Sequence, residues 1–112
     1  MSEENVIKIY GNEDVKRIIA FIPPGHLHAR MIIELRDQTI VLQEATIAGI
    51  IRAYANVALH PRRRAIELIR VKMTGSKKPM FAEHQLVESG RSEEEVLNEA
   101  CRMYYSGYKV EF

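Results

Sequence analysis

A first candidate for chemistry is the segment 42–46, Leu-Gln-Glu-Ala-Thr, where a predicted strand passes into a predicted helix. Backbone N–H groups at the start of a helix point outward and attract anions such as phosphate. The side chains of Gln43 and Thr46 can add donors to such a site, and Glu44 lies between them. The alternative is ordinary capping, in which Glu44 or Thr46 accepts hydrogen bonds from the same N–H groups.

The segment 84–88, His-Gln-Leu-Val-Glu, is a second candidate. It combines the imidazole of His84, the amide of Gln85 and the carboxylate of Glu88 near the end of a predicted strand. Histidine transfers protons near neutral pH because its unperturbed pKa is about 6.5. We therefore predict His84 and Glu88 as catalytic candidates, and a structural role for the histidine is the alternative.

A basic segment lies between these two candidates. Residues 60–78 carry seven basic side chains and one acidic side chain, a local charge of +6 in a chain whose formal charge is +1. Arg62, Arg63 and Arg64 are consecutive within it. Such a concentration of basic residues predicts an anion site. The alternative is a solvated surface whose arginines pair with the glutamates of 93–99.

The sequence does not favour a metal site or a cysteine enzyme. His26 and His28 can both ligate a metal, but no third ligand follows at a recognisable spacing. The single cysteine, Cys101, lies between apolar neighbours of a predicted helix, which predicts a small buried side chain. No glycine-rich phosphate loop or nucleophile elbow is present. We therefore expect no metal and no cofactor.

Length and composition predict one globular domain over residues 1–112. The chain is 46% hydrophobic and 28% charged, which is typical of a folded protein and not of a disordered one. No apolar run approaches the roughly 18 residues of a spanning helix, and the acidic N-terminus is unlike a secretion signal. One cysteine cannot form an internal disulfide. These features predict a cytoplasmic protein without a membrane partner.

The hydrophobic pattern predicts an α+β domain, in which helices cover a mixed sheet of about five to six strands. Strands are predicted over 6–10, 31–35, 39–42, 68–73, 80–87 and 108–112, and helices over 12–22, 43–57 and 92–107. In the strand 68–73, alternation predicts a buried face formed by Ile69, Val71 and Met73. The middle helix is expected to bury an apolar face made of Ile47, Ile50, Ile51, Tyr54 and Val57. A core of this size also predicts an oligomer.

In the order of its motifs, the chain resembles a family of small archaeal-virus proteins that includes the type III anti-CRISPR ring nucleases. The resemblance runs from about Ile33 to the C-terminus. Where this chain reads 42–46, the family typically reads Gly-His-Glu-Ala-Thr, and a family Asn-Arg pair corresponds to Arg63-Arg64. The family motif Gln-Arg-Leu-x-Glu-Gly corresponds to 84–88, with Ser89 before Gly90. A Glu-Glu-x-Leu motif at 94–97 and a Tyr-Ser-Gly ending at 105–107 also fit.

The resemblance implies a homodimer that binds cyclic tetra-adenylate across the dimer and cleaves it without a metal. In the family's reaction, a ribose 2′-hydroxyl attacks the neighbouring phosphate and a histidine protonates the departing 5′-oxygen. This chain has Gln43 in place of that histidine and Gln85 in place of the family arginine, whereas Arg64 and Glu88 match. An amide is not a general acid, so the phosphate-binding half of the site is better preserved than the catalytic half.

Three functions stay open at the level of the sequence. The first is a homodimer that binds a cyclic oligoadenylate or a similar small nucleotide in a basic cleft, with slow metal-independent cleavage. Its ligand-binding residues are Gln43, Glu44, Thr46, Arg62, Arg63, Arg64 and Gln85. The second is a nucleic-acid-binding protein in which Arg70 and Lys72 track phosphates. The third is a protein-interaction protein with no catalytic activity.

Overall fold

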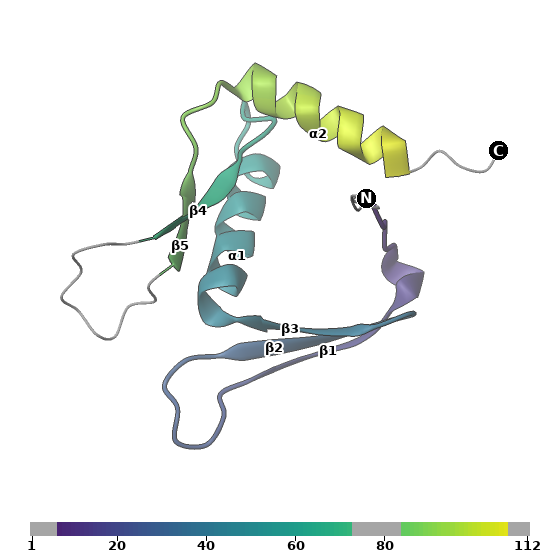
Figure 1. Cartoon of the computed structure of the whole chain (residues 1–112), viewed down its shortest axis with the longest axis vertical. Coiled ribbons are helices and arrows are strands. Elements are labelled where there is room, and N and C mark those ends of the chain that lie inside the picture. Colours follow the sequence, from purple (N-terminus) through teal and green to yellow (C-terminus); the bar gives the residue numbers. More distant parts are fainter. Residues whose placement is uncertain (1–6, 73–83, 108–112) are drawn as a thin grey trace, which may run out of the picture.

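The computed structural model describes residues 7–72 and 84–107. They form a 3₁₀ turn and seven larger elements (Figure 1): η1 (Asn12–Asp14), β1 (Val15–Phe21), β2 (Arg30–Leu35), β3 (Thr39–Gln43), α1 (Glu44–Ala58), β4 (Leu68–Lys72), β5 (His84–Glu88) and α2 (Glu93–Gly107). The predicted α+β class is confirmed. The five strands are divided between two antiparallel sheets, β1-β2-β3 and β4-β5.

The first sheet begins where the sequence predicted a helix. Residues 15–21 form β1, whereas 7–10, predicted as part of a strand, form no regular element. In β1, Ile18 lies opposite Ile33 and Ile19 lies opposite Ile32 of β2. The spacing of the apolar residues in 15–22 fits a helix, but the same β-branched residues pair well on a pleated sheet. Long-range pairing with β2 therefore decided the structure of this segment.

The hairpin β2-β3 forms where the sequence predicted it, and its turn is tied to the segment before η1. The N–H of Leu35 donates to the carbonyl of Gln38 at 2.8 Å, which closes the turn. Asp37 in this turn accepts from Lys8 Nζ at 3.0 Å and from Tyr10 Oη at 2.8 Å. Hydrogen bonds from Lys8 and Tyr10 hold the pKa of Asp37 below its ordinary value. Residues 8–10 are thus fixed by polar contacts and not by a strand.

Helix α1 packs against the second sheet through a glycine. Gly49 is buried, and a Cβ at this position would lie 3.0 Å from Leu86 Cδ1 and 3.7 Å from Leu68 Cδ1. Farther along the helix, Arg52 Nη2 donates to the carbonyl of Leu86 at 2.7 Å. The absence of a side chain at Gly49 therefore allows α1 to approach the β4-β5 hairpin closely.

The predicted buried face of α1 is wrong in its main residues. Ile51 is 62% exposed and Tyr54 is 66% exposed, and Ile50 is exposed too. Ile47 and Val57 are half-buried. Because the helix turns Gly49 toward the hairpin, the opposite side, which carries Ile51 and Tyr54, is left without a covering element among the described residues.

The predicted faces of the β4 strand are wrong in part, although Arg70 and Lys72 are exposed as predicted. Leu68 lies against α1 together with Leu86, so Arg70 and Lys72 share the face that carries these leucines. Ile69, predicted to be buried, is 42% exposed on the other face. Val71 is half-buried, and Met73 lies outside the described residues. Residues 80–83 of the predicted partner strand are likewise outside them, whereas His84–Glu88 pairs as β5.

Helix α2 begins at the predicted capping box. Ser92 Oγ accepts from the N–H of Glu95 at 3.1 Å, and Glu95 Oε1 accepts from the N–H of Ser92 at 3.1 Å. Cys101 on this helix is exposed, which corrects the prediction of a buried thiol. The predicted strand 108–112 lies outside the described residues. Neither described helix has the length and apolar character needed to span a membrane.

Candidate functional site

The predicted site residues outside β5 lie near the two ends of α1, the helix at the centre of Figure 1. Gln43 precedes the helix and Glu44 begins it, whereas Arg62, Arg63 and Arg64 follow its end at Ala58. The helix has 15 residues, and at 1.5 Å per residue such a helix is about 22 Å long. Within one chain, the phosphate-attracting helix start and the arginine run therefore do not face one another across a single cleft.

At the start of α1, the carboxylate of Glu44 is engaged away from the helix. Glu44 Oε1 accepts from the N–H of Ala29 at 2.7 Å and pairs with His28 Nδ1 at 3.1 Å. The Ala29 N–H, followed by His28, holds the pKa of Glu44 below its ordinary value. Gln43 is the residue before the first turn and makes no side-chain capping hydrogen bond. Neither Glu44 nor Thr46, the two residues of the capping alternative, caps this turn among the described residues, so its N–H groups can donate to an external anion.

The hairpin orients His84 toward the same end of α1. Strand β5 runs in the direction of α1, because Leu86 lies at Gly49 while Glu88 pairs with Arg63 beyond the helix end. His84 shares the face of Leu86 and precedes it by two residues. Its cross-strand partner is Lys72. An exposed imidazole and an exposed ammonium group therefore lie on the side of the hairpin nearest the start of the helix.

Gln85 and Glu88 are not neighbours of this end. Gln85 pairs with Val71 in the register and lies on the face opposite His84, where it is half-buried. Glu88 ends β5 and forms an ion pair with Arg63 Nη2. Arg63 Nη1 also donates to Asn56 Oδ1 at 3.4 Å. The structure thus brings Arg63 and Glu88 together and separates both from His84 by the length of β5.

The arginine run is neutralised in part. The charge of Arg63 is matched by Glu88, and the backbone N–H of Arg64 donates to the carboxylate of Glu93. The backbone N–H of Arg62 donates to His60 Nδ1 at 3.2 Å. Within 7–72 and 84–107, no carboxylate pairs with the guanidinium group of Arg62 or Arg64, and both side chains are exposed. These two groups are the accessible positive charge of the run.

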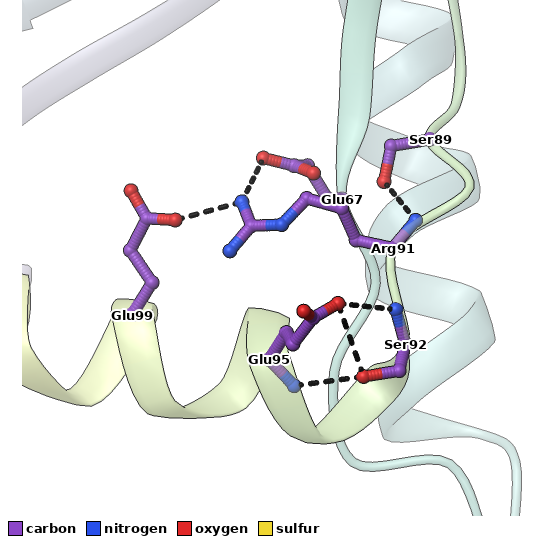
Figure 2. A network of polar contacts seen from close by, with 6 residues as sticks. All are labelled: Glu67, Ser89, Arg91, Ser92, Glu95 and Glu99. Carbon is purple, nitrogen blue, oxygen red and sulfur yellow. Dashed lines mark hydrogen bonds and ion pairs between the residues drawn. The ribbon is translucent and has the colours of Figure 1, made fainter.

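A polar network centred on Arg91 lies beside this run and was not predicted (Figure 2). Arg91 Nη1 donates to Glu99 Oε1 at 2.7 Å and to Glu67 Oε2 at 3.2 Å. The hydrogen bond to Glu99 and the charge of Glu67 raise the pKa of Arg91. Glu67 Oε1 is buried without a hydrogen-bond partner among the described residues. No short motif marks Arg91, because its two partners are 24 and 8 residues away.

Two shallow cavities flank the network. One, of about 230 Å³, is lined by residues that include Arg63, Glu67, Glu88, Arg91 and Glu93. The other, of about 310 Å³, adds Glu99 and apolar side chains of α2. Acidic side chains outnumber basic ones in these linings, so the cavities repel a phosphate more than they attract it. The exposed guanidinium groups of Arg62 and Arg64 are better placed for an anion.

Comparison with protein-family models, with curated proteins and with solved structures finds no match for this chain. Among residues 7–72 and 84–107, no three His, Cys, Asp or Glu side chains converge as the ligands of a metal ion would.

Proposed function

We propose that the chain is a homodimer that binds a small cyclic oligonucleotide, of the cyclic oligoadenylate class, through its phosphates. The observation that carries the proposal is the pair of exposed guanidinium groups on Arg62 and Arg64, which no described carboxylate neutralises. Arginine binds phosphate with a planar, permanently charged fork. A charge of this kind on a chain of net charge +1 favours a compact anionic ligand over a long polyanion.

The start of α1 supports a second phosphate contact. Its first-turn N–H groups have no capping side chain from Gln43, and Glu44 is held by Ala29 and His28. Thr46 is half-buried in this turn and can donate its hydroxyl. Lys72 and His84 approach the same end from the hairpin. In the proposed homodimer, a cyclic ligand that presents several phosphates at fixed separation would take these contacts from both copies of the chain.

Cleavage, if it accompanies binding, depends on His84 and not on Glu88. The carboxylate of Glu88 is paired with Arg63, so it is a weak candidate for proton transfer. An attacking 2′-hydroxyl would form a 2′,3′-cyclic phosphate and expel the 5′-oxygen, which His84 would protonate. Gln43 can hold a phosphate oxygen through its amide but cannot supply this proton. We therefore expect the protein to bind the ligand tightly and to cleave it slowly.

Isothermal titration with cyclic tetra-adenylate tests the proposal. We expect Arg62→Ala and Arg64→Ala each to weaken binding about tenfold, the loss of one charge-assisted contact of roughly 1.4 kcal/mol. Arg102→Ala, which removes an exposed arginine from α2, is the matched control and should bind as the wild type does. Absence of heat with the wild-type protein at high micromolar concentration would refute the proposal.

The products of a metal-free incubation decide between binding and cleavage. Linear di-adenylate that disappears in His84→Ala would identify a slow ring nuclease, whereas intact ligand that co-elutes with the protein would identify a binder. Fluorescence anisotropy with linear single-stranded and duplex probes tests the nucleic-acid alternative. Tighter, strongly salt-dependent binding of those probes would favour it over the cyclic ligand.

A further inference from the structure

The turn that follows α1 is closed by a histidine ring. His60 Nδ1 accepts from the backbone N–H of Arg62 at 3.2 Å, and Pro61 lies between the two residues. Asparagine and aspartate side chains close turns in the same way, by accepting from the N–H two residues on. A backbone N–H can only donate, so this contact requires a neutral imidazole whose Nδ1 carries no proton. The geometry therefore fixes the protonation state of His60 in this turn.

The same turn leads into the accessible positive charge of the chain. The side chains of His60, Arg62 and Arg64 are all exposed, and all three follow the end of α1 at Ala58. Among the described residues, the Arg62 N–H is the one hydrogen-bond partner of the His60 ring. An oxyanion held at Arg62 therefore lies next to two groups that are joined to each other in the free protein, a backbone N–H and an imidazole nitrogen.

We infer that His60 takes up a proton when an anion binds at Arg62, and that the Arg62 N–H then donates to the anion instead of to the ring. The proton comes from solvent and occupies Nδ1, which changes from an acceptor to a donor. Both groups of the turn can then donate to one oxyanion, and hydrogen bonds to a charged acceptor are stronger than neutral ones. The exchange needs only an oxyanion, whereas the identity of that anion as a phosphate of a cyclic oligonucleotide rests on the proposed function.

The positive charges around the turn make proton uptake depend on the anion. Arg62 and Arg64 repel a proton on His60 in the free protein. A bound anion offsets that repulsion, because an opposite charge close to an imidazole favours its charged form. The carbonyl end of α1 attracts a positive charge both with and without the anion. Anion binding and protonation of His60 are therefore expected to support each other.

The carboxylates of the neighbouring segments do not offer His60 a permanent counter-charge. Within 7–72 and 84–107, no carboxylate forms an ion pair with the His60 ring. The three acidic side chains of the adjoining segments each have a partner of their own: Glu67 with Arg91, Glu88 with Arg63, and Glu93 with the N–H of Arg64. An anion that binds at Arg62 is thus the negative charge that a proton on His60 would meet.

Anion binding should strengthen as the pH falls. The bound state holds one more proton at His60 than the free state, so the affinity rises as the pH falls through the range in which histidine titrates, about pH 5 to 8. We expect the wild type to bind cyclic tetra-adenylate about fivefold more tightly at pH 6 than at pH 8, as an imidazolium close to a phosphate at a protein surface implies. His60→Asn keeps an acceptor for the Arg62 N–H but cannot take up a proton, so most of this pH dependence should be lost.

Isothermal titration in two buffers of different ionisation enthalpy measures the proton uptake directly. Near pH 7, we expect the wild type to take up protons when cyclic tetra-adenylate binds, and His60→Asn to take up fewer. His26→Asn is the matched control, because it removes an exposed histidine from the loop between β1 and β2 and should keep the wild-type uptake. Equal uptake by the wild type and His60→Asn would overturn the inference, and so would an equal loss in both variants.

Nitrogen-15 spectra of the histidine rings of the wild type test the exchange without the nucleotide. Sulfate is the probe, because it is an oxyanion that does not titrate near neutral pH. We expect sulfate to shift the His60 ring toward imidazolium and to move the amide signal of Arg62, while the His26 ring stays unchanged. Protonation of His60 by sulfate without binding of cyclic tetra-adenylate would support the inference and refute the proposed function. Nucleotide binding with a neutral His60 would support the proposed function and overturn the inference, as would a His60 that responds to neither anion.

Discussion

The ion pair between Arg63 and Glu88 gives the sharpest prediction, because it decides what Glu88 does. Glu88→Gln removes the carboxylate charge and keeps the size of the side chain. The Arg63 guanidinium group then has only neutral acceptors, the amide oxygen of the new side chain and Asn56 Oδ1 at 3.4 Å. Glu88 is 52% exposed, so solvent screens the pair and the free energy of unfolding should fall by only about 0.5 kcal/mol.

The effect on ligand binding should be larger and opposite in sign. The substitution leaves one uncompensated positive charge beside Arg62 and Arg64. A phosphate roughly 6 Å from that charge gains about 0.7 kcal/mol in water, and about 3 kcal/mol at the effective dielectric of a protein surface. An intermediate gain of about 1 kcal/mol corresponds to about fivefold tighter binding.

Isothermal titration of Glu88→Gln with cyclic tetra-adenylate measures this gain. Glu94→Gln is the control, because it removes an equal charge from an exposed position in the first turn of α2. The tighter binding should decline with added salt. Weaker binding, or loss of cleavage without loss of stability, would show that Glu88 touches the ligand. If Glu88→Gln and the control bind the ligand equally well, Arg63 lies away from the ligand.

Three further predictions concern stability and access. Ser92→Ala should lower the free energy of unfolding by about 1 kcal/mol and the Tm by about 4–6 °C in thermal denaturation, whereas Glu95→Gln, which can keep the capping box, should change both less. The folded-state pKa of Glu44 is lowered from 4.5, so its carboxylate stabilises the folded state above pH 4.5. This contribution to the free energy of unfolding is lost as the pH falls below 4.5. The urea midpoint should therefore fall more between pH 6 and pH 3 for the wild type than for Glu44→Gln. Cys101 should react with a thiol reagent in the native protein as fast as an exposed thiol, and Cys101→Ser should abolish the labelling.

Elements with local signals could be predicted from the sequence. The β2-β3 hairpin, α1 and the start of α2 each carry their own pattern, and the Ser92–Glu95 box is complete within four residues. The structure of segment 15–21 could not be predicted in this way, because its adjacent Ile18 and Ile19 fit a helix stripe and also fit the two faces of a strand. Pairing with Ile33 and Ile32 decided between the two structures, and those partners lie more than ten residues away.

The sequence indicated which residues belong to the candidate site, but it did not indicate which of them lie close together in the fold. Arg63 and Glu88 were both selected, but nothing in their 25-residue separation indicates that they neutralise each other. The side of α1 that packs was predicted from its isoleucines, whereas the actual contact is made at Gly49, where the lack of a side chain permits it. Periodicity identifies which residues share a face, but it does not say whether that face meets its own chain or another.

The charge that a ligand meets on this protein differs from the charge written in the sequence. Residues 60–78 sum to +6 along the chain, yet folding pairs Arg63 with Glu88 and places Glu93 at the backbone of Arg64. The exposed guanidinium groups of Arg62 and Arg64 follow the end of α1, whereas the open first-turn N–H groups and the exposed Lys72 lie toward its start. The charge that folding leaves accessible is therefore divided between the two ends of one helix, which the linear sum over residues 60–78 does not show.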